Sequence, residues 1–205
     1  GAGAGIGAGV ARRFADEGAR VVVAEFDADA GASVAREIDG LFVQADVSHR
    51  EQVENAVATC VSEYGAIDIL VNNAWGGGSI GRVENKTDDQ LAHGIAVGYY
   101  GPFWAMRAAQ RHMKERGWGR VINMCSLNGV NAPMGSLEYN AAKEALRALT
   151  RTAAREWAPM GVTVNAVCPA AKSQAFLRAM ADYQDRVRAM VEQMDSEGFG
   201  NCTNH

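Results

Sequence analysis

The length, composition and charge of this chain are those of an ordinary globular protein. It has 205 residues, 48% of them hydrophobic and 21% charged, with a net charge of −4 at pH 7. One domain of this size can bury a full core, and the composition argues against a disordered, collagen-like or coiled-coil protein. A mildly acidic chain is a poor candidate for binding nucleic acid or an anionic membrane. No apolar run approaches the roughly 20 residues that span a bilayer.

Short apolar runs alternate with longer helical stretches along the chain. In order, the pattern predicts a helix over residues 8–18, a strand over 21–24, a helix over 28–38, a strand over 41–43, a helix over 49–64, a strand over 67–71, a helix over 88–116, a strand over 121–124, a helix over 137–158 and a strand over 162–167. Strands that are apolar throughout are buried on both faces. Because helices separate them, we expect an α/β fold with a doubly wound parallel sheet and helices on both faces.

Local signals support two helix starts and one buried helix face. Ser48 with Glu51, and Thr87 with Gln90, have the spacing of a capping box. The helix over 137–158 carries apolar residues at spacings of three and four, which are Ala142, Leu146, Leu149, Ala153 and Trp157.

The four cysteines and four histidines do not indicate a metal site. Cys60, Cys125, Cys168 and Cys202 are widely scattered, and the histidines form no HExxH pattern. We expect reduced thiols in a cytoplasmic protein with no metal. The Gly/Ala-rich start does not have the pattern of a secretory signal.

The chain opens with G-A-G-A-G-I-G, in which Gly1, Gly5 and Gly7 have the spacing GxxxGxG. Glycines let a backbone turn sharply and approach a pyrophosphate, and the following helix presents free N–H groups. Alone, such a start is also typical of a flexible leader. The interpretation as a phosphate-binding turn gains support from Glu25, which follows a predicted strand 20 residues after Gly5.

Glu25 predicts the choice of dinucleotide. At this separation a carboxylate fits the adenosine ribose 2′-OH, although a solvated loop carboxylate is the alternative and Asp27 lies near enough to share the role. Glu25 would repel a 2′-phosphate, and neither Arg nor Lys follows it directly, while Ala4 precedes Gly5. We therefore predict NAD(H) in preference to NADP(H).

Tyr139 and Lys143 are spaced i, i+4 on one predicted helix, so they share a face. A free tyrosine is a poor base at neutral pH, but a nearby ammonium favours the phenolate. A tyrosine in that setting can exchange a proton with an alcohol or carbonyl oxygen. Ser126 lies just beyond the strand over 121–124, where its hydroxyl would face a ligand crevice. A surface helix pair is the alternative for the Tyr–Lys spacing alone.

Shorter motifs accompany these residues in a fixed order. They are A-D-V at 45–47, N-N-A at 72–74, N-M-C-S at 123–126, Y-N-A-A-K at 139–143 and N-A-V-C-P at 165–169. Together with the glycine turn, they resemble the short-chain dehydrogenase/reductase family from Gly1 to about Pro169. Each match is modest alone, but all of them in order are a strong resemblance.

The resemblance implies a Rossmann-like sheet and a role for each matching residue. Tyr139 would be the general acid/base, Lys143 would hold the nicotinamide ribose and favour the phenolate, and Ser126 would polarise the substrate oxygen. The cofactor would be bound by Gly1, Gly5, Ile6, Gly7, Glu25, Asp46, Val47, Asn73, Ala74, Tyr139, Lys143 and Pro169. The reaction would transfer hydride between NAD(H) and a secondary alcohol or ketone.

Gly98 departs from the family pattern, which has Asn at this position in a proton relay whose backbone carbonyl holds a water. Pro102 lies four residues later and has no N–H, so the Gly98 carbonyl would lack its helical partner. We expect Gly98 to serve the catalytic relay through its backbone in a locally bent helix. The alternative is that glycine relieves crowding beside Tyr99 and Tyr100.

Two further departures lie near the expected ligand. Trp75 replaces the glycine of N-N-A-G, which lets the backbone approach the cofactor closely. Three interpretations stay open: Trp75 forms a wall on the substrate side, it packs within the loop, or the glycines at 76–78 restore the close approach. Ala170 replaces a glycine after Pro169, with Ser173 as a candidate hydroxyl. Apolar residues of the neighbouring loops line a substrate pocket or serve only packing; they are Leu127, Val130, Met134 and Leu137.

The family's first strand precedes the glycine turn, and its last strand is not recognisable at 194–205. We therefore expect one dinucleotide-binding and catalytic domain over 1–205, incomplete at the N-terminus and at the C-terminus, with substrate-covering helices over 174–194. Family members are commonly homodimers or homotetramers joined through two long helices, here 88–116 and 137–158. Alternative functions are an NADPH-dependent 3-oxoacyl-thioester reductase, a dinucleotide-binding protein with impaired catalysis, or an inert fragment.

Overall fold

The computed structural model describes residues 1–76, 78–170, 181, 184–185, 188–189 and 192. The elements follow one another in the predicted alternation of helix and strand. In chain order they are α1 (Gly5–Asp16), β1 (Val22–Glu25), α2 (Ala28–Glu37), β2 (Leu41–Gln44), α3 (Arg50–Tyr64), β3 (Ile69–Asn72), η1 (Val83–Asn85), α4 (Asp88–Ile95), η2 (Ala96–Tyr100), α5 (Gly101–Arg116), β4 (Gly119–Met124), α6 (Asn128–Asn131), α7 (Leu137–Trp157), η3 (Ala158–Met160) and β5 (Val162–Val167).

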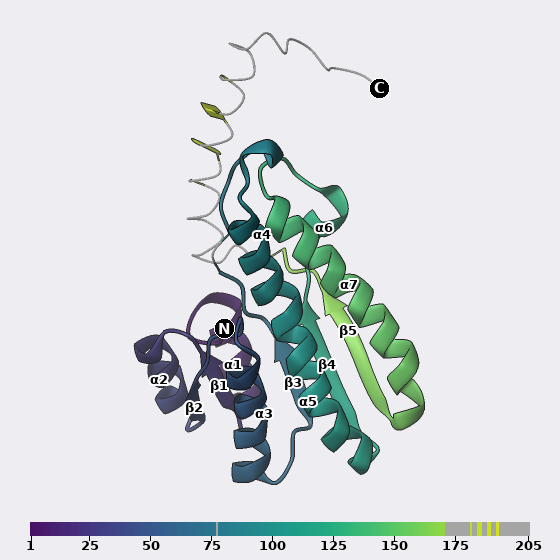
Figure 1. The fold of residues 1–205 in the computed structure, drawn as a ribbon. Helices are drawn as coiled ribbons and strands as arrows, with labels where there is room; N and C mark the ends of the chain where they lie inside the picture. Colours follow the sequence, from purple (N-terminus) through teal and green to yellow (C-terminus); the bar gives the residue numbers. More distant parts are fainter. Residues whose placement is uncertain (77, 171–180, 182–183, 186–187, 190–191, 193–205) are drawn as a thin grey trace.

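All strand pairs of the described chain are parallel, and they form two separate sheets. β1 pairs with β2, with Val23 opposite Phe42. The second sheet has the order β3-β4-β5, with Val121 of β4 opposite Leu70 and Val164. Figure 1 shows β1 and β2 with α1 and α2 on one side of the molecule, and β3, β4 and β5 with α5 and α7 on the other. The α/β, Rossmann-like arrangement of parallel strands flanked by helices is therefore confirmed.

Each sheet has its own hydrophobic core. Val23 of β1 packs with alanines and a valine of α1 and α2 in the smaller core. The larger core joins β4 and β5 to α5 and α7, and its centre contains Met106, Met113, Val121 and Val162, each at most 1% exposed. Helix α3 contacts β1, β2 and α5, so it connects the two halves. These two cores hold the carboxyl ends of the strands at one edge of the molecule.

A cavity of about 450 Å³ lies between β1 and β3, lined by residues of both strands and by the glycine-rich start. Because these strand edges face the cavity, β1 and β3 are only half-buried over most of their length, and Ile69 is 36% exposed. The prediction that every strand is buried on both faces is therefore wrong for these two, and also for β2 and β5, which carry exposed residues. It holds for most of β4, which has a neighbour on each edge.

The helix predicted over 88–116 is formed, but a π-helical turn at Ala96–Tyr100 interrupts it. Its start is the predicted capping box, in which Thr87 accepts from the Gln90 N–H and the Gln90 side chain accepts from the Thr87 N–H. The second predicted capping box is wrong. The N-cap of α3 is His49, and the Ser48 hydroxyl donates instead to Asp46 Oδ1 at 2.7 Å.

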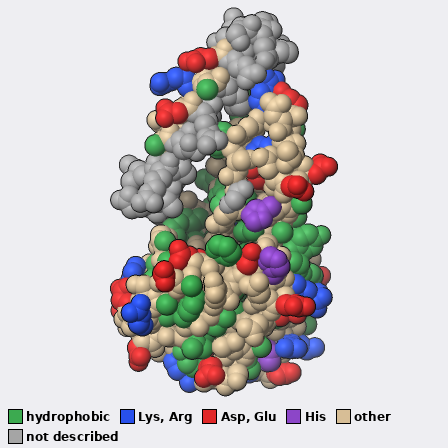
Figure 2. All heavy atoms as spheres, turned by 60° about the vertical axis from the view of Figure 1, so that its left-hand side comes forward, with side chains coloured by type: hydrophobic (Ala, Val, Ile, Leu, Met, Phe, Trp, Pro, Cys, Tyr) green, Lys and Arg blue, Asp and Glu red, His purple; other side chains and the backbone are tan. Residues whose placement is uncertain are grey.

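Acidic and basic side chains are interspersed on the face drawn in Figure 2, so the described residues of that face carry no extended basic patch. Within the described part of the chain, each helix is too short or too polar to cross a bilayer. The helices expected over 174–194 and the Ser173 hydroxyl lie outside the described residues, apart from isolated positions.

Candidate active site

Helix α7 brings Tyr139 and Lys143 to the end of β4. The Lys143 side chain is buried, and its Nζ donates to the Met124 carbonyl oxygen at 2.7 Å. The same Nζ lies 5.7 Å from the centre of the Tyr139 ring. The two side chains therefore lie on one face of α7, as their spacing predicted, and that face covers the carboxyl end of the sheet.

Burial controls the charge of Lys143. Desolvation lowers the pKa of this ammonium from 10.5 to about 8, and no carboxylate is among the groups that offset the effect. An ammonium so weakly compensated favours any anion placed next to it, because an opposite charge stabilises the ionised form of its neighbour. The site is therefore built to support a phenolate or an anionic ligand.

Ser126 follows β4 by two residues and starts the turn that leads into α6. Its Oγ accepts a hydrogen bond from the Asn128 N–H at 3.1 Å, which leaves the hydroxyl hydrogen available as a donor. Since Met124 accepts from Lys143, the end of β4 places Ser126 and the Lys143 ammonium in the same neighbourhood. Ser126 and Lys143 are therefore both positioned by the last residue of β4: Ser126 follows it in the chain, and Lys143 donates to its carbonyl oxygen.

Trp75 packs against the tyrosine and lysine directly. The Trp75 and Tyr139 rings meet edge to face with centroids 4.7 Å apart, and Lys143 Nζ lies 5.6 Å from the Trp75 ring centre. Trp75 itself is half-buried. Of the interpretations left open by the sequence, the one in which the indole walls the site agrees with this geometry.

Gly98 sits in the π-helical turn, beside the site. The Gly101 N–H bonds to the Ala96 carbonyl five residues back, and Pro102 has no N–H to offer Gly98. The predicted local distortion of the helix is therefore confirmed. A Cβ at position 98 would lie 2.7 Å from both Ala142 Cβ and Trp75 Cζ3. Glycine at this position therefore avoids an overlap with α7 and Trp75.

The glycine-rich start lies across the carboxyl ends of β1 and β3. The Gly1 nitrogen donates to the Ala24 carbonyl at 2.6 Å, and the Gly1 carbonyl accepts from Asn73 Nδ2 at 2.6 Å. A side chain at Gly7 would overlap the Gly1 carbonyl oxygen. Helix α1 begins at Gly5, and its N-cap Ala4 offers no side-chain acceptor to the first N–H groups. This open helix start fits the pyrophosphate of a dinucleotide, because unpaired helical N–H groups bind anions.

Glu25 ends β1 beside this loop, with its side chain 16% exposed. Its Oε2 accepts from the Gly3 N–H at 2.8 Å, and its Oε1 accepts from the N–H groups of Phe26 and Asp27. Burial raises the pKa of the Glu25 carboxyl, but the hydrogen bonds from these N–H groups lower it, and the pKa lies below its usual value. Asp27 caps α2 by accepting from Ala30, so the two acids have different local partners.

The remaining predicted cofactor residues also lie at strand ends. Asp46 follows β2, and its carboxylate accepts from the Ser48 N–H and hydroxyl, which anchors the start of α3. Val47 packs closely against Gly101 of α5. Ala74 contacts Gly1, while Ile6 lies in the first turn of α1 and Pro169 lies exposed beyond β5.

Two buried polar groups escaped the sequence analysis. Asn123 of β4 is fully buried, accepting from Asn72 Nδ2 at 2.8 Å and donating to Thr150 Oγ1 at 2.9 Å. Glu138, next to Tyr139, is 1% exposed and pairs with Lys86, which is 4% exposed. Asn72 and Asn123 stood inside quoted motifs, but the Lys86–Glu138 pair had no motif to reveal it.

The loop residues suggested as a pocket lining are mostly exposed. Leu127, Val130 and Met134 are 59%, 54% and 55% exposed, so packing within the described chain does not account for them. Across the described residues, no group of three or more His, Cys, Asp or Glu side chains is placed to hold a metal ion.

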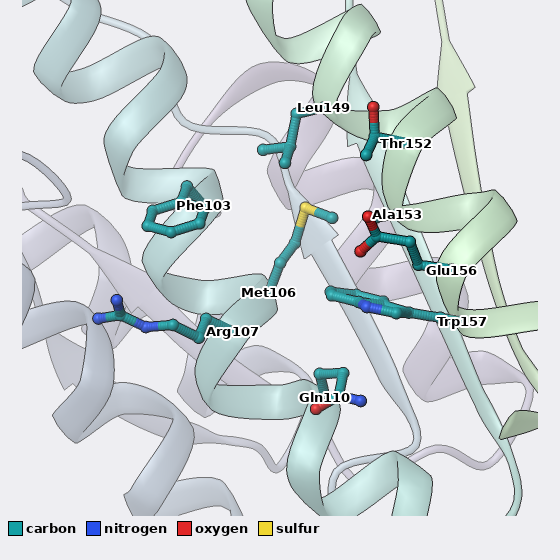
Figure 3. Close-up of a pocket in the computed structure, with 9 residues that line it drawn as sticks. All are labelled: Phe103, Met106, Arg107, Gln110, Leu149, Thr152, Ala153, Glu156 and Trp157. Carbon is teal, nitrogen blue, oxygen red and sulfur yellow. The ribbon is translucent and has the colours of Figure 1, made fainter.

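Helices α5 and α7 line a second hollow of about 300 Å³. Figure 3 shows side chains of the two helices facing each other across it, with Phe103 and Met106 on α5 and Leu149 and Trp157 on α7. Leu149 and Trp157 belong to the apolar face predicted for this helix, and they remain only partly buried.

Comparison with known proteins decides the family. A family model described as short chain dehydrogenase matches residues 1–185. This chain belongs to the short-chain dehydrogenases. It is 35% identical to the D-beta-hydroxybutyrate dehydrogenase of Rhizobium meliloti over 92% of this chain and 76% of that protein.

Solved structures of other short-chain dehydrogenases have the same fold. A 3-ketoacyl-(acyl-carrier-protein) reductase from Brucella melitensis, complexed with NADH, has a TM-score of 0.82 and 33% identity, over 86% of this chain and 75% of that one. An NAD+-bound xylitol dehydrogenase has a TM-score of 0.77 and 32% identity, over 82% of this chain and 66% of that one. The recognised family and its oxidoreductase class are thus established for this chain.

Proposed function

We propose that this short-chain dehydrogenase transfers hydride between NAD(H) and a secondary alcohol or ketone. The observation that carries the proposal is the buried Lys143 ammonium, held at the end of β4 on the same face of α7 as Tyr139. A buried cation beside a phenol favours the phenolate, which is the form able to take a proton from an alcohol. The two related structures bound to NADH and NAD+ support the choice of cofactor.

Tyr139 is the general acid/base in this mechanism. A bound nicotinamide supplies or accepts the hydride. In the oxidative direction Tyr139 takes the hydroxyl proton, while the Ser126 hydroxyl donates a hydrogen bond to the same oxygen and orients it. Lys143 holds the phenolate form by its charge. In the reductive direction the same groups act in reverse, and Tyr139 returns the proton to the carbonyl oxygen.

The backbone around Gly98 maintains the proton supply in this proposal. The π-helical turn widens the helix where Pro102 cannot donate, so the Gly98 carbonyl retains a free lone pair. A carbonyl in that position holds a water that reaches the Lys143 ammonium. Wide turns of this kind are frequent at functional sites.

The dinucleotide is bound at the glycine-rich start. Gly1, Gly5, Ile6 and Gly7 form the turn that meets the pyrophosphate, and Glu25 accepts from the ribose hydroxyls. Asp46 and Val47 border the adenine, Asn73 and Ala74 the adenosine side, and Pro169 the nicotinamide end. Because the pKa of the Glu25 carboxyl lies below its usual value, its negative charge opposes a 2′-phosphate, and the enzyme prefers NAD(H).

The cofactor preference is tested by steady-state kinetics with NAD(H) and NADP(H). We expect a kcat/KM ratio in favour of NAD(H), and a fall of at least about tenfold in that ratio for Glu25→Ala, since charge repulsion of the 2′-phosphate is removed. Asp29→Ala, in the first turn of α2, is the matched acidic control. A wild-type preference for NADP(H) contradicts the assignment.

A 3-oxoacyl-thioester reductase is the second candidate, because one of the two neighbouring structures carries that activity. A panel of secondary alcohols and ketones, together with a 3-oxoacyl thioester, distinguishes the candidates. Higher kcat/KM for the thioester supports the reductase. Tight NADH binding without turnover on any of these substrates indicates a protein that binds dinucleotide but has lost catalysis.

We further propose a homodimer or homotetramer joined through the α5–α7 hollow. Its apolar residues form the unfilled surface shown in Figure 3, and Ala148 keeps the exposed side of α7 small. Phe103→Glu is expected to lower the oligomeric mass in sedimentation experiments.

The three described cysteines carry free thiols, which favours a cytoplasmic location.

A further inference from the structure

The segment between β3 and α4 is fastened to the first turn of α7 by a buried ion pair. Lys86 Nζ lies 2.8 Å from Glu138 Oε2 and 3.0 Å from Glu138 Oε1. Glu138 Oε1 also accepts from the Ser79 N–H at 2.7 Å, and Lys86 donates to the Ser79 carbonyl. Because isolated buried charges are very costly, these partners hold one another in place. We call Ser79, Lys86 and Glu138 the loop lock.

Helix α4 packs against Glu138 as well. Gly94 of α4 lies so close to Glu138 that a Cβ at position 94 would be 2.6 Å from Glu138 Cβ. Further along the segment, the Gly81 N–H donates to the Gly135 carbonyl at 3.0 Å. The segment is therefore held at two points against the residues that immediately precede Tyr139.

Trp75 lies earlier in the same segment. Its indole ring is surrounded by Gly98, Gly78, Tyr139 and Lys143. The ring fills the space that any side chain at position 98 would need. Trp75 and Gly98 therefore form a complementary pair, and the indole has little freedom to leave the phenol.

From this arrangement we propose that Trp75 is a specificity-determining residue, whose indole limits the size of the group next to the reacting carbon. The indole lies edge to face with the Tyr139 ring, with centroids 4.7 Å apart, so it borders the space next to the phenol that a bound substrate would enter. The inference rests on the proposed reaction. Lys86 and Glu138 act as positioning residues, since they hold the segment that carries the indole.

The test compares NADH-dependent reduction of butan-2-one and acetophenone. The measured quantity is the ratio of kcat/KM for acetophenone to that for butan-2-one. We expect Trp75→Ala to raise this ratio at least about tenfold, since differences of pocket size have effects of this order, and Trp75→Phe to raise it less. Trp118→Phe is the matched control, because this tryptophan is 41% exposed and packs on Arg120 at the start of β4.

Lys86→Met probes the lock independently. We expect it to shift the ratio in the same direction as Trp75→Ala, and to add nothing in the double variant, because both changes act on the same ring. A purely structural lock lowers kcat/KM for both ketones equally. If Lys86→Met fails to fold, the Trp75 variants still decide the proposal.

The outcomes separate this inference from the proposed function. An unchanged ratio in Trp75→Ala, with both ketones still reduced, overturns the specificity role alone. Failure of the wild type and of Trp75→Ala to turn over any secondary alcohol or ketone of the panel contradicts the proposed reaction itself, whereas activity on other ketones moves the size comparison to a small and a large member of that active set. A ratio that rises equally in Trp118→Phe also overturns the inference, because the effect would not belong to this site.

Discussion

The two halves of the molecule hold their polar groups in different ways. In the half built on β3, β4 and β5, Lys143, Asn123 and Glu138 are at most 4% exposed, and each has a defined partner on another element. In the half built on β1 and β2, Glu25 bonds to backbone N–H groups of the glycine-rich start and of its own neighbours. The polar side chains of the first half are thus fixed by a packed core, whereas Glu25 in the second half depends on hydrogen bonds to loop backbone.

The strands show the same contrast. β4 has a hydrogen-bonded neighbour on each edge, while β1 and β3 each turn one edge to the cavity between the sheets. Unpaired strand edges are weak points of a sheet. The difference teaches that polar groups inside a packed core are held by several elements, and we expect ligand binding to stabilise the β1–β2 half more than the β3–β5 half.

Removing the buried charge of Lys143 is expected to have the largest effect on stability. Because the pKa of Lys143 is lowered from 10.5 to about 8, the unfolded chain binds more protons than the folded chain between these pH values. Wild-type stability therefore rises with pH across this window, and the full cost, on the order of 3 kcal/mol, applies below pH 8. Lys143→Met is expected to raise the free energy of unfolding at pH 7 by up to that amount.

Urea unfolding at pH 7 and pH 10 measures this effect, with Lys114→Met on the exposed surface of α5 as control. The gain should shrink at the higher pH and be absent from the control. Destabilisation by Lys143→Met at both pH values would contradict the prediction that burial of the Lys143 ammonium lowers the free energy of unfolding.

Gly98→Ala is expected to cost about 2 kcal/mol of unfolding free energy, since overpacking a filled space costs 1–3 kcal/mol. Its Cβ would collide with Ala142 and Trp75. Gly9→Ala is the matched control, because a Cβ at this exposed position of α1 meets no atom within 4 Å. We expect the control to be stabilising through helix propensity. Equal effects of the two substitutions would contradict the tight packing of the catalytic half.

The open sheet edges predict unequal hydrogen exchange. Amide protons of β4 should exchange slowest, and those of β1 and β3 that point into the cavity should exchange about 100-fold faster, as expected where opening is local. Mass spectrometry or NMR exchange measurements check this. Equal protection of β1, β3 and β4 would show that the two sheets are one unit in solution.

The sequence predicted the elements well because each carried its own periodic signal. The strand at Val162–Val167 and the helix at Leu137–Trp157 were expected within a residue of their observed bounds. Thr87 with Gln90 capped its helix as expected, but Ser48 did not, because its N–H and its hydroxyl both donate to the Asp46 carboxylate and His49 is the N-cap of α3. A spacing alone does not reveal that a second carboxylate nearby takes the hydrogen bond that the capping box needs.

The candidate site was predictable where its residues lie on one element, and less so where they come from several. The i, i+4 spacing alone is enough to place Tyr139 and Lys143 on one face of a helix. The Trp75–Gly98 contact and the Lys86–Glu138 pair join residues far apart in the chain. No local periodicity encodes such contacts, because they depend on how the segments pack in three dimensions.

Replacement of Tyr139 by Phe tests the central claim most directly. Turnover of the best secondary alcohol or ketone and the affinity for NADH should be measured in Tyr139→Phe, with Tyr64→Phe in α3 as the control. Loss of the acid/base hydroxyl predicts a fall in kcat of about 10³-fold, with unchanged NADH affinity and a fully active control. Full turnover by Tyr139→Phe would contradict the proposed mechanism.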